Sequence, residues 1–138
     1  MKTTDYGVPK CAWAAHSLER LDGPGPHLII VPTEQDLEPL VADLKSLASD
    51  RLVFGYSDDE HHPYSPLTPN PRNTWSRLGL LARLSVGEPV GIVVAAARAI
   101  GRSVPDLKTI NTTSLLLGVG EVLERDQLLE HLEGAGYH

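Results

Sequence analysis

The residue pattern closest to known chemistry lies at residues 4–11, which have the spacing of a phosphate-binding loop, G-x-x-x-x-G-K-[ST]. Such a loop points backbone N–H groups at phosphates, and its Lys and Ser/Thr complete the site. Here Thr4 replaces the first Gly, Pro9 replaces the second, and Cys11 replaces the hydroxyl. Pro9 has no N–H to donate, and a thiol is a poor ligand for Mg²⁺. The sequence therefore predicts a degenerate loop without catalytic, cofactor-binding or metal-binding function, formed by Thr4, Gly7, Pro9, Lys10 and Cys11.

Two residues of this loop have a second interpretation. Lys10 is either a residual phosphate ligand or an exposed lysine in the first turn of a helix, and the missing loop glycines favour the exposed lysine. Cys11 is either a reactive thiolate, favoured by a helix N-terminus and a neighbouring lysine, or a half-buried structural cysteine that faces the sheet. We expect the structural cysteine.

Residues 58–62, Asp-Asp-Glu-His-His, are a candidate metal site. Adjacent histidines seldom reach one ion together, and no second pair of ligands stands at a suitable spacing. We therefore expect a solvated acidic loop. The loose basic group of Arg98, Arg102 and Lys108 is likewise interpreted as a solvated face.

The proline-rich connection at residues 55–71 offers a candidate interaction surface. Rigid prolines lower the entropy cost of presenting neighbouring side chains to a partner. A connection that packs over the strand ends explains the same composition equally well. The residues that would form the surface are Pro63, Tyr64, Pro66 and Leu67.

Composition restricts the class of protein. The chain has 138 residues, a formal net charge of −6 and scattered basic residues, which disfavours binding of nucleic acid through its phosphates. One cysteine excludes an intramolecular disulfide and fits a cytoplasmic setting. The longest apolar run, residues 90–97, is too short to span a bilayer, so no membrane contact is expected.

The elements that must position these residues alternate between helical and strand-like segments. Short apolar runs predict buried parallel strands at 27–31, 52–54 and 90–94. Helical spacing predicts helices at 9–21, 33–48, 71–86, 96–101 and 125–132, with Thr33 capping the second and a further strand near 113–117. The third helix should turn Trp75, Leu78, Leu81 and Ala82 inward, as core rather than as a partner-binding stripe. The alternation predicts an α/β fold, a three-layer domain with a mostly parallel sheet.

Several short motifs occur in a recognisable order. A strand ending in Phe54 precedes Pro63-Tyr64, Ser65-Pro66, Arg77-Leu78 and Leu80-Leu81. The strand and turn at 90–99 follow, and then Leu117–Glu121, Leu128-Leu129 and Gly136-Tyr137. Together these pieces resemble the N-terminal UvrB-homology region of bacterial transcription-repair coupling factors (Mfd). The chain departs from that pattern at Tyr56-Ser57-Asp58, where the family often has a Trp-Glu pair.

UvrB itself shares the architecture that this resemblance implies. It has an intact phosphate loop and a tyrosine-rich DNA hairpin, whereas this chain has a degraded loop and only Tyr56 and Tyr64 in the corresponding connection. Both differences favour the coupling factor. The implied fold is P-loop-NTPase-like, as in UvrB domain 1a.

The resemblance also implies a domain organisation and a set of partners. Residues 1–110 would form domain 1a with its degenerate phosphate loop, and residues 111–138 would begin a truncated domain 2. The family's full-length protein is an ATP-driven DNA translocase that displaces stalled RNA polymerase and recruits UvrA. This segment would pack on the rest of its polypeptide and would not itself be an enzyme. UvrA would bind the adjoining domain 2, and RNA polymerase and DNA would bind other domains.

Two alternatives from other classes remain open at this level. The chain could be a divergent but functional ATP-binding domain, in which Lys10 still contributes to nucleotide affinity. It could also be a stand-alone, flavodoxin-like protein-interaction module, without a downstream second domain or motor.

Overall fold

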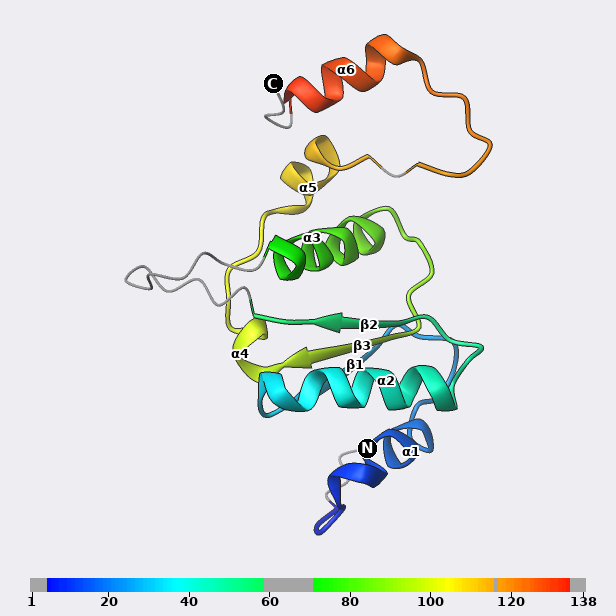
Figure 1. Cartoon of the computed structure of the whole chain (residues 1–138), viewed down its shortest axis with the longest axis vertical. Helices are drawn as coiled ribbons and strands as arrows, with labels where there is room; N and C mark the ends of the chain where they lie inside the picture. Colours follow the sequence, from blue (N-terminus) through cyan, green and yellow to red (C-terminus); the bar gives the residue numbers. More distant parts are fainter. Residues whose placement is uncertain (1–4, 59–70, 116, 135–138) are drawn as a thin grey trace.

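A parallel three-stranded sheet forms the centre of the computed structural model, which describes residues 5–58, 71–115 and 117–134 (Figure 1). The strand order is β1-β3-β2, and both neighbours pair with β3 in parallel. His27 of β1 and Val53 of β2 both lie opposite Ile92 of β3. The strands are β1 (His27–Val31), β2 (Val53–Tyr56) and β3 (Ile92–Ala96). The predicted α/β fold with a parallel sheet is confirmed.

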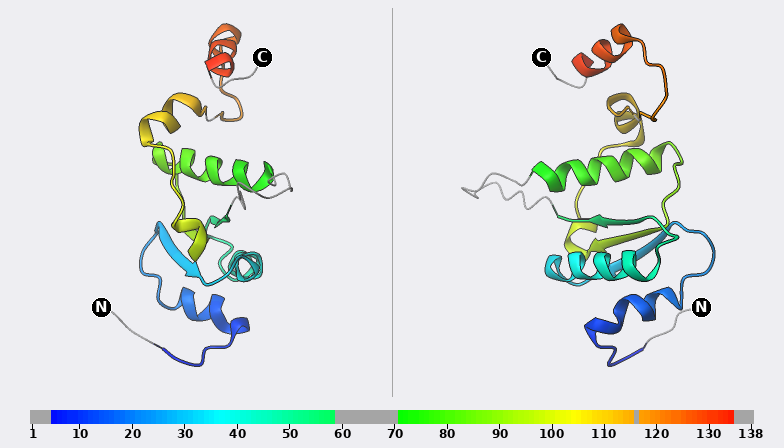
Figure 2. Two further views of the ribbon diagram at one scale, coloured as in Figure 1. Left: turned by 90° about the vertical axis from the view of Figure 1, so that its left-hand side faces the viewer. Right: turned by 45° about the vertical axis from the view of Figure 1, so that its right-hand side comes forward.

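Helices cover both faces of this sheet. The chain crosses from β1 to β2 through α2 and returns from β2 to β3 through α3. Because these crossovers run in opposite directions along the sheet, crossovers of the same hand place α2 and α3 on opposite faces. Figures 1 and 2 show α1 and α2 on one side of the sheet and α3 with α5 on the other. The helical elements are η1 (Lys10–Ala12), α1 (Trp13–Leu18), η2 (Glu34–Asp36), α2 (Leu37–Leu47), α3 (Pro71–Ser85), α4 (Ala97–Ile100), α5 (Leu107–Thr113) and α6 (Arg125–Gly134).

The pattern of buried residues in each element follows from its position in the fold. All five residues of β3 are buried, as expected for the central strand of a parallel sheet with both faces covered. The edge strand β1 alternates instead, with Val31 buried and Leu28 and Ile30 more than half exposed. In α2, Leu37, Leu40 and Leu44 recur at helical spacing, and their burial fixes the face turned to the sheet.

The predicted orientation of α3 is partly wrong. Ala82 is buried and Leu81 packs against the core, but Trp75 is 69% exposed and Leu78 is 44% exposed. Arg77 and Leu80 are the residues of the middle of α3 that are buried. Since α3 packs between the sheet and α5, it is apolar on two sides, and periodicity alone does not say which side faces the sheet.

The strand predicted near residues 113–117 is absent from the described part of this region. Thr113 ends α5, and residues 114, 115 and 117 belong to no strand. Among the described residues, no helix combines the length and the apolar character that crossing a membrane requires.

Candidate functional site

The carboxyl ends of β1, β2 and β3 lie at one edge of the sheet, which is where open α/β sheets generally hold ligands. Charged residues follow each strand at this edge. Glu34 and Asp36 come after β1, Asp58 comes after β2, and Arg98 and Arg102 come after β3. Because the three strands are parallel and in register, these side chains are brought to the same place.

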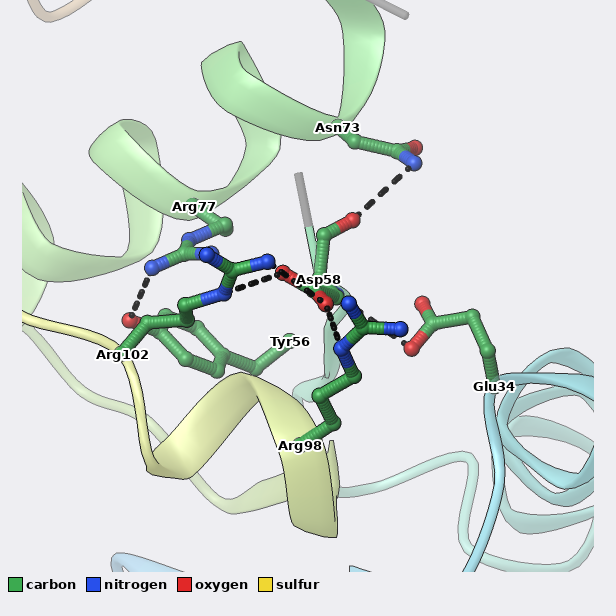
Figure 3. Close-up of polar contacts among 7 residues, drawn as sticks. All are labelled: Glu34, Tyr56, Asp58, Asn73, Arg77, Arg98 and Arg102. Atoms are coloured by element: carbon green, nitrogen blue, oxygen red, sulfur yellow. Dashed lines mark hydrogen bonds and ion pairs between the residues drawn. The ribbon is translucent and has the colours of Figure 1, made fainter. Parts of the chain in front are cut away.

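Asp58 is the centre of the resulting cluster (Figure 3). Its carboxylate is 4% exposed and is bound by two guanidinium groups of α4 and the turn that follows it. Nε of Arg98 lies 3.0 Å from Oδ2, and Nε of Arg102 donates to Oδ1 at 3.1 Å. The prediction of a solvated acidic loop is therefore wrong at Asp58, because a buried carboxylate needs paired charges around it.

The backbone of Asp58 is held as well as its side chain. Its N–H donates to Oε2 of Glu34 at 3.2 Å, and its carbonyl accepts from Nδ2 of Asn73 at 3.5 Å (Figure 3). Glu34 lies in η2 and Asn73 in the first turn of α3. One residue thus joins the segments after β1 and β3 to the start of α3.

Arg77 and Tyr56 form a second polar contact beside this cluster. Nη2 of Arg77 donates to the Tyr56 hydroxyl at 3.1 Å, and its guanidinium lies 4.8 Å from the centre of the Tyr56 ring. Both residues are buried. Cation–π contact and hydrogen bonding together compensate the burial of an arginine at the α3–sheet interface.

The two arginines after β3 differ in exposure. The side chain of Arg98 is 70% exposed and that of Arg102 is 34% exposed. The predicted solvated face therefore describes Arg98 and the exposed Lys108, but it misses that Arg98 and Arg102 share a buried carboxylate.

The degenerate phosphate loop adopts a geometry unlike a nucleotide site. Thr4 lies outside the described residues. Residues 5–9 form no strand, Gly7 has a positive φ of 76°, and Pro9 precedes a single 3₁₀ turn, η1. Cys11 is exposed, so the expectation that it faces the sheet is wrong.

Lys10 is held by contacts within the chain. Its Nζ pairs with Oδ1 of Asp36, and it lies 5.7 Å from the centre of the Trp13 ring. The lysine is exposed, as the sequence predicted, with a side-chain exposure of 73%, but its charge is engaged. Its ammonium is therefore directed to a carboxylate of the same chain.

Asp36 is the buried partner of this pair. The Thr33 hydroxyl donates to its Oδ2 at 2.6 Å, instead of Thr33 capping a helix as the sequence suggested. The hydrogen bond from Lys10, followed by that from Thr33, holds the pKa of the Asp36 carboxyl below its ordinary value of 3.8. Asp36 is thus stabilised in its ionised form.

The other predicted site residues lie outside this geometry. Asp59 to His62 and the proposed interaction residues Pro63, Tyr64, Pro66 and Leu67 are outside the described residues. In the part of the chain that the structure describes, no three His, Cys, Asp or Glu residues are grouped to hold a metal. An apolar groove of about 380 Å³ lies on the α3 side of the sheet, with Leu28, Leu84 and Ile100 in its lining. Its mainly aliphatic lining does not suit a phosphate.

Sequence reasoning missed Glu34, Asp36, Asn73 and Arg77 as members of polar clusters. One signal was available for the acidic residues, because each follows a predicted buried strand and so belongs at the carboxyl edge. No comparable signal marked Asn73 and Arg77, which lie in α3 and whose partners are distant in sequence.

Comparison with known proteins adds a family relationship. No protein-family model matches the chain. The transcription-repair-coupling factor of Bacillus subtilis (strain 168) is 32% identical over 112 residues, which cover 81% of this chain and 9% of that protein. The transcription-repair-coupling factor of Myxococcus xanthus is 31% identical over 137 residues, covering 93% of this chain and 11% of that protein. The chain therefore spans only about a tenth of the length of these curated relatives.

The Asp58 cluster predicts a specific loss of stability. Asp58→Ala leaves Arg98 and Arg102 without their carboxylate and is expected to lower the free energy of unfolding by about 1–3 kcal/mol. Hydration of the exposed Arg98 keeps the loss below that of a fully buried pair. The measurement is urea denaturation. Asp43→Ala on the exposed face of α2 is the control, and equal midpoints for the two variants would contradict the assigned role.

The lowered pKa of Asp36 predicts acid-dependent stability. Since the folded-state pKa lies below the unfolded-state value, ionised Asp36 stabilises the fold above its ordinary pKa of 3.8, and this contribution is lost as the pH falls through the lower folded-state value. Asp36→Asn should therefore lower the urea midpoint at about pH 7 and have much less effect at about pH 2. The control is Glu38→Gln, a change at an exposed residue two positions along the chain. An equal loss at both pH values would refute the assignment.

Proposed function

Since the chain belongs to the family of transcription-repair-coupling factors, we propose that it is the non-catalytic, UvrB-like N-terminal module of such a factor. In this role it supports the domain that recruits UvrA and thereby helps to couple the removal of stalled RNA polymerase to nucleotide excision repair. Its direct partner is the rest of the same polypeptide, and RNA polymerase and DNA bind elsewhere in it. The proposed place of action is the cytoplasm, where these partners act on the chromosome.

The Lys10–Asp36 pair is the observation that carries the non-catalytic part of this proposal. A phosphate loop needs a free lysine, a series of backbone N–H donors and a hydroxyl for Mg²⁺. Here the lysine is paired with Asp36, Pro9 has no N–H, and Cys11 replaces the hydroxyl. Each change removes a different part of the nucleotide site, so ATP hydrolysis is assigned to another part of the full-length protein.

Differences in burial support a domain division close to the predicted one. Ile110 of α5 is 4% exposed, and α5 packs on α3. Beyond α5, Leu117, Val119 and Val122 are 61%, 110% and 98% exposed, and α6 has no buried residue. We therefore place the first domain through the end of α5 at Thr113, three residues beyond the predicted boundary. The described residues after it begin the UvrA-interaction domain.

The non-catalytic role is tested by nucleotide titration. Adding Mg-ATP to the protein is expected to leave its thermal unfolding midpoint unchanged, because a ligand stabilises only a fold that it binds. The matched variant is Lys10→Ala, whose unfolding midpoint should likewise not change when Mg-ATP is added. A rise of several degrees in the wild type that is absent from Lys10→Ala would establish a functional ATP site instead.

The proposed place in a longer protein is tested by the coding sequence after residue 138. We expect it to continue the second domain and then to encode a domain that binds RNA polymerase, followed by helicase motifs. A stop codon directly after that position would favour a stand-alone interaction module.

A further inference from the structure

The Lys10–Asp36 pair has the properties of an occupied anion site. We propose that the Asp36 carboxylate is a built-in anionic ligand of Lys10, which takes the position that an external phosphate would need and fastens residues 5–18 against α2. The inference deepens the proposed function, on which it rests, by naming what occupies the lysine of the degenerate loop.

The donors around Asp36 resemble those of a phosphate site in kind. The Lys10 ammonium contacts Oδ1, and the Thr33 hydroxyl donates to Oδ2 at 2.6 Å. Lysine and a hydroxyl are the two side-chain donor types of a phosphate loop. In this chain they come from different segments, the N-terminal turn and the residues after β1, and both are directed to a carboxylate.

The exposure of the two partners explains why the carboxylate keeps this position. The Asp36 side chain is 8% exposed, whereas that of Lys10 is 73% exposed. Solvent reaches the ammonium but hardly reaches the carboxylate, which the fold holds in place. A dissolved anion must therefore compete with an anion that is already positioned and has lost little freedom on binding.

The N-terminal segment depends on this contact more than a longer element would. Helix α1 has six residues, of which Ala14 is the buried one, and so short a helix is not stable alone. Trp13 Nε1 donates to the Val8 carbonyl, and Asp5 pairs with Arg20, but both contacts lie within the segment or its immediate continuation. Among the described residues, the Lys10–Asp36 pair is the polar side-chain contact that joins residues 5–20 to the rest of the fold.

Hydrogen exchange of the full 138-residue chain tests the fastening. Asp36→Asn and Lys10→Met are each expected to raise amide exchange in residues 12–18 by about fivefold, because each removes the same contact. The double variant should exchange no faster than either single variant, since the two effects share one interaction. Glu38→Gln, an exposed acidic residue in the first turn of α2, should match the wild type.

Either of two results would overturn the fastening. One is unchanged exchange in Lys10→Met, a substitution of an exposed side chain that leaves the core intact. The other is full additivity of the two single substitutions.

Chemical rescue tests the ligand role. In Asp36→Ala, inorganic phosphate should restore part of the lost protection of residues 12–18, with sodium chloride of equal ionic strength as the control. In the Lys10→Met/Asp36→Ala double variant it should not. Phosphate that protects both variants equally, or neither, would show that Asp36 does not stand in for an anion at Lys10.

These outcomes are independent of the nucleotide titration. Exchange and rescue are measured without nucleotide, whereas the proposed function is refuted by stabilisation of the wild type with Mg-ATP.

Discussion

A carboxylate that has been removed from water must be paired, and in this protein that requirement organises the carboxyl edge of the sheet. Asp58 follows β2, and its ion pairs with Arg98 and Arg102 reach the segment after β3. Its backbone binds Glu34 after β1 and Asn73 at the start of α3. The connections at all three strand ends are therefore fixed relative to one another through one residue, and α3 is held at its first turn.

At the same edge, charged side chains pair with one another within the chain. Asp36 and Asp58 are buried, whereas their partners Lys10 and Arg98 are largely exposed. In an active ATPase, cations at this edge neutralise phosphates. In this protein, Lys10 and Arg98 are instead neutralised by carboxylates of the same chain. This distribution supports a scaffolding role, because ion pairs of this kind stabilise connections without leaving a charged site ready for a ligand.

The sequence predicted the three parallel strands and the helices between them, because short apolar runs and helical spacing are local signals. The sequence-based prediction was wrong where it had to choose which face of a helix is buried. In α3, helical spacing allowed either Trp75 and Leu78 or Arg77 and Leu80 to face inward. Packing against both the sheet and α5 buried the second pair. The exposed position of Cys11 was missed for the same reason, since helical position does not reveal which neighbour covers a side chain.

The sequence by itself predicted a degenerate phosphate loop and the resemblance to the family. A proline without an N–H at position 9 and a thiol at position 11 are properties of single residues, and no fold changes them. The order of short motifs is likewise readable along the chain. Only the tertiary structure decided which charged side chains pair with each other. Lys10 and Asp36 are 26 residues apart, and Asp58 and Arg102 are 44 apart. Asp58 meets Arg102 because parallel strands bring their carboxyl ends to one edge, whereas Lys10 meets Asp36 because α1 packs on α2. In both pairs, burial leaves the carboxylate in need of a cation.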